Sequence, residues 1–468
     1  MPTAAVLSAT LFAAAAVAVP DWKAVEAETL RHFQTLVRMD TSDPPGNEKP
    51  AADYLRKVLE AEGIPVEVIA IDPKRPNVIA RLKSSAAGRH RPLLLMGHTD
   101  VVGVQPEKWK LFPPFSAAVS DGYVYGRGTV DDKDNVTAAL MTILLLKRLK
   151  TPLDRDVIFL AEAGEEGSMQ YGIAHLVEKQ WPLIEAEFCL AEGGGVRRRD
   201  GRPHRMLVAT TEKNPTAVKL IARGTAGHGS APLPDNALER LAGAIGRISA
   251  WRPPLRLNDT TRTYFEKLAA ISTPEQAARY HGLLDPARTE AIQEYLRLHE
   301  PVHYSMLRAS LATTMIQGGY RVNIIPSEAE AVLDVRTMPG EDVEAFLTAL
   351  RAVVRDPSVE VIHTPRRDVR IGEPSRLDTP LYRALEAAQR RIYPGAITLP
   401  VMSTGGSDKA YLQARGMQCY GIGAATDDED GPKGFGAHSD QERVLEAELH
   451  RFVRFNWEVV TALAAGGK

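Results

Sequence analysis

The sequence predicts an α/β protein whose layered sheet is interrupted by a second, smaller domain. Two apolar runs, at residues 93–96 and 157–160, are typical of strands that are covered on both faces. Between them, residues 135–149 carry apolar side chains at helical spacing. Strands that alternate with helices in this way indicate a layered sheet with helices packed against it. A new series of strand and helix patterns after residue 211 predicts the inserted α+β domain.

The other elements follow from the same periodicities. In the first part we expect helices at 25–39 and 51–62, and strands at 66–71, 77–81, 92–96 and 188–190. In the later part we expect strands at 217–222, 329–336 and 419–422, helices at 236–248, 380–392 and 442–463, and a mostly helical stretch at 255–311. The pattern breaks near 210–214, so we divide the chain into segments 1–19, 20–211, 212–368 and 369–468, with the second and last segments forming one domain.

Composition excludes several classes of protein. The 468 residues include 57 lysines and arginines against 59 acidic residues, for a formal net charge of -2. This balance argues against a nucleic-acid-binding protein, which usually has a strong basic excess. The two cysteines, Cys189 and Cys419, are too few for a disulfide framework or a cysteine zinc site. Any metal site must therefore use histidine and carboxylate ligands.

The N-terminal segment has the character of a targeting signal. Residues 1–19 carry no charged side chain and are rich in alanine. The small residues Ala16 and Ala18 resemble a signal-peptidase cleavage site, so we expect a secreted or periplasmic protein. The alternative is a frayed helix at the start of a cytoplasmic protein. The segment is short for a membrane span, which needs about 20 apolar residues, and no later segment is apolar enough to form one.

Acidic and histidine side chains stand where predicted strands end or in glycine-rich turns. In open α/β sheets, ligands bind outside the carboxyl ends of the strands. The candidates at such places are His98, Asp100, Asp131, Glu165, Glu166, Glu192 and His438. Each has an ordinary alternative when taken alone: a core or surface histidine, a solvated glutamate pair, or an aspartate that caps a helix, as Asp132 would. Their joint occurrence points to a metal site.

These residues lie in five motifs that resemble, in the same order, those of the cocatalytic dizinc exopeptidases and amidohydrolases. That family includes aminoacylase, succinyl-diaminopimelate desuccinylase, carnosinase and bacterial glutamate carboxypeptidase. The motifs are His98-Thr99-Asp100-Val101-Val102, Gly126-Arg127-Gly128 with Asp131 and Lys133, Glu165-Glu166-Gly167, Glu192-Gly193-Gly194-Gly195, and His438. The resemblance runs from about residue 26 to the C-terminus. It implies a zinc-exopeptidase-like layered α/β/α catalytic domain, with residues 212–368 as a smaller lid or dimerisation domain.

The resemblance implies two zinc ions bridged by the carboxylate of Asp131. His98 and Glu192 would hold one ion, and Glu166 and His438 would hold the other. This set is chemically sound, because zinc accepts histidine nitrogen and carboxylate oxygen. A bridging carboxylate also offsets the repulsion between two cations about 3.5–4 Å apart. The same ligands accept cobalt or manganese.

The resemblance gives two further acids a role. Glu165 would be the general base, which takes a proton from the metal-bound water and passes it to the leaving amine. Asp100 would orient His98 by accepting the proton of its other ring nitrogen.

The inserted domain contributes a second set of candidates. His228, in Gly227-His228-Gly229-Ser230, resembles the family histidine that reaches into the partner subunit's site and stabilises the oxyanion, which implies a homodimer. Asn323 and Arg336 resemble substrate-binding positions, and the fork of arginine suits a free carboxylate. Gly405 and Gly406 resemble a loop that offers backbone amides to the same carboxylate. The alternatives are a turn histidine, a surface salt bridge at a strand end, and a simple glycine turn.

Four residues depart from the family pattern. Asp134 follows Lys133 where the family often has glycine. Gln441 stands before Glu442 where asparagine is common, and Ala163-Gly164 precede the glutamate pair where acids are frequent. None of them removes a proposed ligand or the base, but they leave the subfamily open.

The sequence therefore predicts a dizinc metallohydrolase that cleaves an amide or peptide bond next to a free carboxylate, as a carboxypeptidase or dipeptidase does. Its substrate would be a small peptide. An N-acyl-amino-acid deacylase is the alternative, with an N-acyl amino acid as substrate. A protein of another class, a catalytically silent binder of amino acids or peptides, would be expected to lack the base or a ligand. The stretch 255–311 is expected to shape the pocket.

Overall fold

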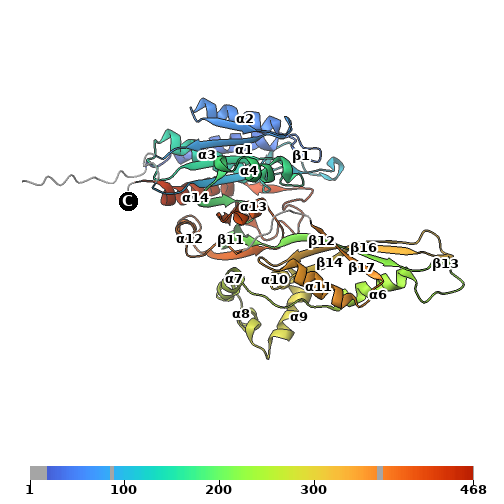
Figure 1. The fold of residues 1–468 in the computed structure, drawn as a ribbon. Coiled ribbons are helices and arrows are strands. Elements are labelled where there is room, and N and C mark those ends of the chain that lie inside the picture. The colour runs from blue at the N-terminus through green and yellow to red at the C-terminus, as the bar shows by residue number, and fades with distance from the viewer. Residues whose placement is uncertain (1–17, 85–88, 366–372, 467–468) are drawn as a thin grey trace, which may run out of the picture.

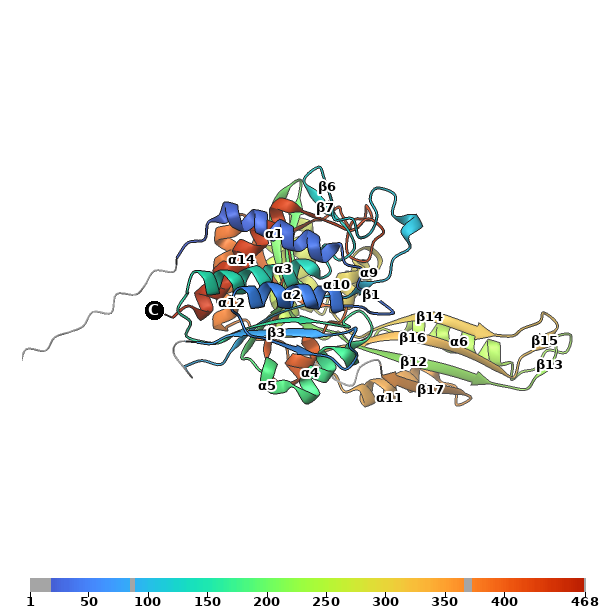
Figure 2. The same cartoon turned by 90° about the horizontal axis from the view of Figure 1, so that it is seen from above.

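A computed structural model describes residues 18–84, 89–365 and 373–466. Residues 1–17 of the expected signal peptide lie outside this part of the chain. A ten-stranded sheet with helices on both faces forms the larger body of the molecule. A four-stranded sheet forms an arm that extends from this body (Figures 1 and 2). No helix of the described segments combines the length and apolarity that a bilayer span requires.

The large sheet is parallel at its centre. Its strands, in spatial order, are β2 (Val66–Ile69), β3 (Asn77–Leu82), β8 (Val157–Glu162), β4 (Leu93–His98), β9 (Phe188–Ala191), β19 (Gln418–Gly421), β11 (Arg202–Glu212), β10 (Gly195–Arg199) and β20 (Thr426–Asp427), with β18 (Ile397–Ser403) paired to β11. The pairs β8–β4, β4–β9 and β9–β19 are parallel, so the carboxyl ends of these strands meet at one edge. Every residue of β4 and β8 is buried, as their apolar sequences predict.

Helices cover both faces of this sheet and complete three layers. On one face lie α1 (Trp22–Val37), α2 (Lys49–Ala61), α3 (Lys133–Arg148), α12 (Pro380–Ile392) and α14 (Glu446–Ala464), which share the largest apolar core. On the other face lie α4 (Ile173–Lys179), α5 (Trp181–Ile184) and α13 (Lys409–Ala414). The layered α/β prediction is thereby confirmed, as is the expectation of a second, inserted sheet.

The arm is an antiparallel sheet in the order β14 (Ser310–Gly318), β16 (Glu328–Thr337), β12 (Asn214–Arg223) and β17 (Val359–Pro365). Two helices, α6 (Ala237–Ala250) and α11 (Val343–Val354), pack on one face. Alternate residues of β16 such as Leu333 and Val335 point into this core, so Asp334 and Arg336 lie on the other face. At the far end of the arm, β13 (Gly227–His228) pairs with β15 (Ile324–Ile325) (Figure 2).

Short strands complete the loops of the larger body. β1 (Ser42–Asp43) pairs with β5 (Val101–Val102), and β6 (Ala118–Ser120), β7 (Tyr123–Tyr125) and β21 (Arg443–Leu445) form a small sheet. These strands were not predicted, because two or three residues carry too little periodicity to reveal a strand. β11 was also missed, since the sequence change near 210–214 reads as a break rather than as the end of a long strand.

One residue joins the two sheets at this point. β11 ends at Glu212 and β12 begins at Asn214, with Lys213 between them. The Lys213 ammonium is buried and donates to the backbone carbonyls of Ser305, at 3.0 Å, and Arg308, at 2.8 Å. The junction is therefore tied to the chain that leads into β14.

The stretch 255–311 forms four helices that pack on the larger body. They are α7 (Asp259–Ala269), α8 (Pro274–His281), α9 (Thr289–His299) and α10 (Pro301–Met306). Phe265 of α7 is buried in a cluster that includes Leu399 and Met402 of β18. Our division of the sequence placed this stretch in the inserted domain, whereas its apolar contacts join it to the large sheet. Periodicity identifies an apolar face but not the surface that covers it.

Truncating Phe265 tests this packing. Its side chain is 3% exposed, and loss of a buried phenylalanine typically costs about 3–5 kcal/mol. We expect Phe265→Ala to lower the free energy of unfolding by that amount in urea denaturation. Leu298→Ala on α9 is the control, because Leu298 is 58% exposed and should have little effect. Equal, small effects of both substitutions would contradict the packing described here.

Candidate metal centre

The carboxyl ends of the central strands bring the predicted ligands together. His98 is the last residue of β4, and Glu192 directly follows β9. Glu165 and Glu166 lie in the turn that follows β8. Because these strands are parallel neighbours, their carboxyl ends place the three segments side by side.

Asp131 lies between two imidazole rings. One of its carboxylate oxygens is 3.0 Å from Nε2 of His98, and the other is 3.1 Å from Nε2 of His438. The same nitrogen of His438 is 3.2 Å from Oε1 of Glu166. Burial works against ionisation of Asp131, but the hydrogen bonds with both histidines hold its pKa below the usual range. Asp131 thus has the position of a bridging ligand.

Two groups of side chains in the described segments have metal-site dimensions here. In one group His98, Glu165 and Glu192 offer ligand atoms within 4.8 Å of one another. In the other His98, Asp131 and Glu166 do so. The first group includes Glu165, which the sequence predicted as the base rather than as a ligand. All the donors are nitrogen or carboxylate oxygen, which are the ligands that zinc, cobalt and manganese accept.

The carboxylates crowd one another. Burial, and then the neighbouring Glu192, raises the pKa of Glu165 well above its ordinary value. Burial, and then Asp131, raises the pKa of Glu192 to about 7. Buried like charges at such distances are unfavourable unless a cation compensates them. The donor set therefore fits a pair of divalent cations.

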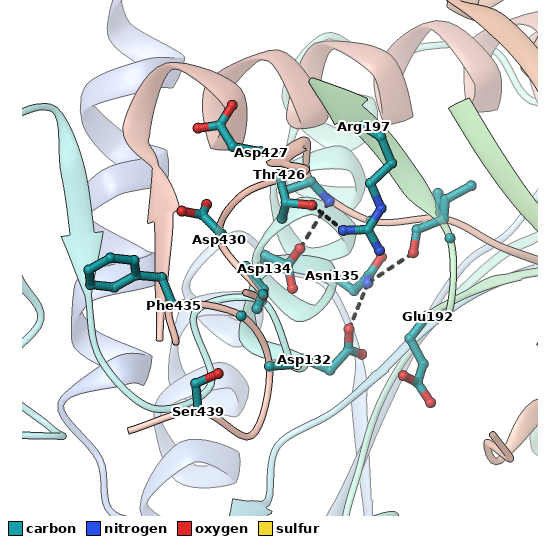
Figure 3. A pocket seen from close by; sticks show the side chains of 18 residues that line it. Asp132, Asp134, Asn135, Glu192, Arg197, Thr426, Asp427, Asp430, Phe435 and Ser439 are labelled. Atoms are coloured by element: carbon teal, nitrogen blue, oxygen red, sulfur yellow. Dashed lines mark hydrogen bonds between the residues drawn. The ribbon is translucent and has the colours of Figure 1, made fainter. Parts of the chain in front are cut away.

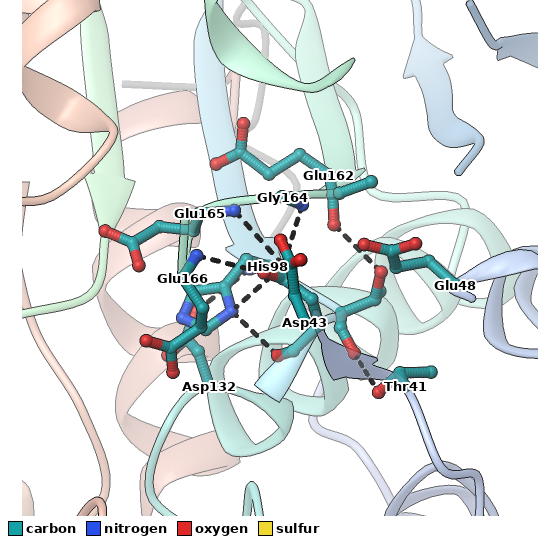
Figure 4. Close-up of polar contacts among 12 residues, drawn as sticks. Thr41, Asp43, Glu48, His98, Asp132, Glu162, Gly164, Glu165 and Glu166 are labelled. Atoms are coloured by element: carbon teal, nitrogen blue, oxygen red, sulfur yellow. Dashed lines mark hydrogen bonds and ion pairs between the residues drawn. The ribbon is translucent and has the colours of Figure 1, made fainter. Parts of the chain in front are cut away.

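Asp100 contacts both His98 and the turn that carries the two glutamates; Figure 4 shows His98 beside Gly164, Glu165 and Glu166 of this turn. Oδ1 of Asp100 accepts hydrogen bonds from the backbone N–H groups of Gly164, at 2.9 Å, and Glu165, at 3.3 Å. Its Oδ2 accepts from the N–H of Glu166 at 2.9 Å. Nδ1 of His98 is 3.5 Å from the Asp100 carboxylate but 3.0 Å from its backbone carbonyl. The carbonyl is thus the nearer partner of the ring, and the carboxylate mainly holds the glutamate turn, a contact the sequence did not reveal.

Asp132 has a different role from the capping role weighed as an alternative. It occupies the N-cap position of α3, yet its side chain makes no capping hydrogen bond. Instead Oδ2 accepts from the backbone N–H of His98 at 3.2 Å, and Oδ1 accepts from the amide of Asn135 at 2.6 Å. Asp132 therefore fixes the backbone of one proposed ligand while its neighbour Asp131 faces the centre.

Glu442 fixes the loop that carries Asp131. Its buried carboxylate accepts from the backbone N–H of Gly128 at 3.0 Å and of Val130 at 2.8 Å, and from the guanidinium of Arg127 at 2.7 Å. We did not identify Glu442 as a functional residue from the sequence. Its position four residues after the proposed ligand His438 could have suggested a supporting role.

A cavity of about 380 Å³ adjoins the centre on the side of Glu192 (Figure 3). Asp132, Asp134 and Asn135 line it from the start of α3, and Arg197 lines it from β10. Asp134, the departure from the family glycine, accepts a hydrogen bond from the N–H of Ala424 at 3.1 Å. Burial raises its pKa to about 7. The hydrogen bond of Asp134 thus connects the start of α3 to the segment that follows β19.

Within one chain, the candidates at the far end of the arm, His228 and Asn323, do not reach the centre. His228 is exposed at the far end of the arm, where its Nδ1 is 2.7 Å from the hydroxyl of Ser230. Asn323 lies beside it, since its carbonyl accepts from the N–H of Gly229 at 2.9 Å. Arg336 forms an ion pair with Asp334 at 2.7 Å, which is the alternative role considered for it.

The glycine candidates lie in the larger body. Gly405 donates its N–H to the hydroxyl of Ser403 at 3.1 Å, in the exposed turn after β18 that also contains Gly406. Beneath this turn, a network that the sequence did not indicate is buried. Nζ of Lys409 is 2.9 Å from the carboxylate of Glu212, and Lys409 also interacts electrostatically with Glu192.

Comparison with known proteins identifies the family to which this chain is similar. The profile of Peptidase family M20/M25/M40 matches residues 94–461. The N-fatty-acyl-amino acid synthase/hydrolase of Homo sapiens is 29% identical over 332 residues, which cover 69% of this chain and 64% of that protein. The probable succinyl-diaminopimelate desuccinylase of Staphylococcus aureus is 25% identical over 338 residues, which cover 71% of this chain and 74% of that protein. The match thus spans less than two thirds of the human relative's length.

Solved structures share the fold. An M20 family metallo-carboxypeptidase from Sulfolobus solfataricus superposes with a TM-score of 0.69 at 21% identity, covering 93% of this chain and 99% of that one. Human carnosine dipeptidase 1 superposes with a TM-score of 0.60 at 16% identity, covering 94% and 98%. The resemblance predicted from the motifs is confirmed by these matches.

Replacing Asp100 tests whether it holds the centre together. In Asp100→Asn one acceptor oxygen becomes an NH₂ group, which faces backbone donors and cannot accept from them. Loss of such a supporting partner typically lowers metal affinity by about 10–100-fold, and we expect that loss here. Competition with a chromogenic chelator measures it. Asp53→Asn is the matched control, because the Asp53 side chain is 46% exposed and its ion pairs within the described residues are with the exposed Lys49 and Arg56. Wild-type metal affinity in Asp100→Asn would contradict this role.

Proposed function

The chain belongs to Peptidase family M20/M25/M40, and from that premise we propose that it is a dizinc metallohydrolase. It would cleave an amide or peptide bond next to a free carboxylate, as a carboxypeptidase or dipeptidase does. The observation that carries the proposal is Asp131, with one carboxylate oxygen at His98 and the other at His438. Glu192 and Glu166 would complete the two ligand sets.

When bound, the metal pair would polarise the scissile carbonyl and lower the pKa of the attacking water. Glu165 would accept the proton of that water and deliver it to the leaving amine. Burial and then the neighbouring Glu192 raise the pKa of Glu165 above that of a solvated carboxylate, which makes it a stronger base. The N–H groups held by Asp100 keep Glu165 in place relative to Glu192.

Arg336 and the Gly405-Gly406 turn would bind the substrate carboxylate, and Asn323, which lies beside His228 at the end of the arm, would contribute to the partner's site as His228 does. Arg336 is on the face of the arm sheet that is not covered by α6 and α11, so its guanidinium can exchange Asp334 for a substrate carboxylate. The substrate would be a small peptide. An N-acyl amino acid is the second candidate, because the human relative's name describes hydrolysis of N-fatty-acyl amino acids. A panel of dipeptides and N-acyl amino acids separates the two.

A catalytically silent binding protein is the less favoured function. Its signature would be loss of the base or of a ligand. Glu165 and the five proposed ligands are all present, and those at the strand ends lie together.

The proposed enzyme acts as a homodimer in which His228 serves the partner's site. His228 is exposed at the end of the arm, away from its own Asp131. The edge strand β14 leaves apolar side chains uncovered, with Met315 at 52% and Ile316 at 61% exposed. Such an edge favours pairing with a second chain. There, the imidazole would stabilise the oxyanion.

We also propose that residues 1–19 are a secretory signal, so that the mature enzyme is secreted or periplasmic. N-terminal sequencing of the protein from its native host should begin near residue 19 or 20. An intact Met1 would exclude cleavage.

Substitution of the base tests the mechanism. Glu165→Gln should lower kcat by about 10²–10⁴-fold, because it removes proton transfer. Two metal ions per chain should remain, as measured by elemental analysis. Glu178→Gln, on the exposed face of α4, is the control and should have wild-type kcat. Chelation should abolish turnover and added zinc should restore it. Retained turnover in Glu165→Gln, or activity that resists chelation, would refute the mechanism.

Mixing two inactive variants tests the exchange of His228. A dimer of one His228→Ala chain and one Glu165→Gln chain has one complete site if His228 acts on the partner. About half of the dimers are mixed after exchange, so about a quarter of wild-type activity should return. Action within one chain predicts no recovery. Light scattering that found an active monomer would also exclude the exchange.

A further inference from the structure

A cavity of about 530 Å³ lies on the helix-covered face of the arm sheet, apart from the metal centre. It is open to solvent on one side and is lined by the end of α6, by α10 and by the first residues of β14. Its apolar wall includes Ile248, Trp251, Leu311 and Leu333. Leu333 points to the helix-covered face of the sheet, whereas Arg336 points to the opposite face. The cavity is therefore separated by the sheet from the proposed substrate-binding arginine.

The polar wall of this cavity is basic. Arg308 is 3% exposed and lines both this cavity and an adjoining one of about 390 Å³. Its guanidinium donates to the carbonyl of Pro253 at 3.0 Å and to the side chain of Gln293, while its Nε has no partner. Burial lowers the pKa of Arg308, and the nearby Arg252 lowers it further.

Both arginines donate hydrogen bonds to backbone carbonyls. Arg252 donates to the carbonyls of Ser249, at 2.8 Å, and Trp251, at 3.2 Å. Within the part of the chain that the structure describes, neither Arg252 nor Arg308 forms an ion pair with a carboxylate. Arg297, the third arginine at the cavity, is already paired with Glu294 at 2.5 Å. Arg252 is exposed and interacts electrostatically with Glu294, whereas the buried guanidinium of Arg308 has no carboxylate partner among the described residues.

We infer that this cavity binds a long-chain carboxylate. The carboxylate would lie between the exposed Arg252 and the buried Arg308, and its charge-assisted hydrogen bond to Arg308 would be the stronger because less water competes there. The hydrocarbon chain would lie along Ile248, Trp251 and Leu311. A volume of about 530 Å³ is within the range of small-molecule sites. The buried, uncompensated charge of Arg308 favours an anion, and the apolar wall favours an aliphatic chain over an inorganic ion.

Titration calorimetry of the full chain with dodecanoate tests the inference. Arg252→Gln and Arg308→Gln should each weaken binding about tenfold, the effect of one lost charge-assisted hydrogen bond. Arg256→Gln is the matched control, because Arg256 is exposed, lies outside the cavity and faces Glu341 at 3.6 Å. It should bind dodecanoate as the wild type does.

A second variant covers the case in which Arg308→Gln fails to fold. Thr313 lines the cavity from the exposed strand β14, opposite Leu333. Thr313→Trp should fill the cavity and abolish binding while both arginines remain. Wild-type affinity in Arg252→Gln and Thr313→Trp would overturn the inference. Equal affinity for uncharged dodecanol would also overturn it, because binding would then not require the carboxylate. Equal affinity for sulfate would do the same, because binding would then not require the hydrocarbon chain.

Discussion

The position of Asp131 is the constraint on which the site depends. Its two carboxylate oxygens face His98 and His438, which come from opposite ends of the sequence. The loop that carries Asp131 is fixed by Glu442, and the backbone of His98 is fixed by Asp132. A carboxylate held this way can offset the repulsion between two cations, and the acids around it need those cations to be stable in a buried place.

The parallel centre of the large sheet makes this arrangement available. Four neighbouring strands end at one edge, so a ligand that follows β4 lies next to ligands that follow β8 and β9. Asp100 then couples two of these segments, because its carboxylate binds three N–H groups of the glutamate turn while its backbone carbonyl contacts the ring of His98. The cavity of about 530 Å³ beside the arm sheet is formed differently. Helices and a sheet edge line it, and its charge comes from Arg252 and Arg308.

Strand ends and long helices could be predicted from the sequence, because their patterns extend over many residues. His98, Glu165 and Glu192 were found in this way, since each follows an apolar run. The supporting contacts of Asp100 and Glu442 could not be, because they depend on loops that meet only in the folded chain. The same holds for Phe265, whose apolar face was evident although the sheet that covers it was not. His228 could be recognised only by its motif, and its position at the end of the arm explains why one chain does not bring it to the site.

Crystals of the zinc-loaded protein, with anomalous diffraction recorded at the zinc absorption edge, test the central claim most directly. We expect two zinc peaks, one on each side of the Asp131 carboxylate. One peak should contact His98 and Glu192, and the other should contact Glu166 and His438. A single peak, or two peaks that Asp131 does not join, would contradict it.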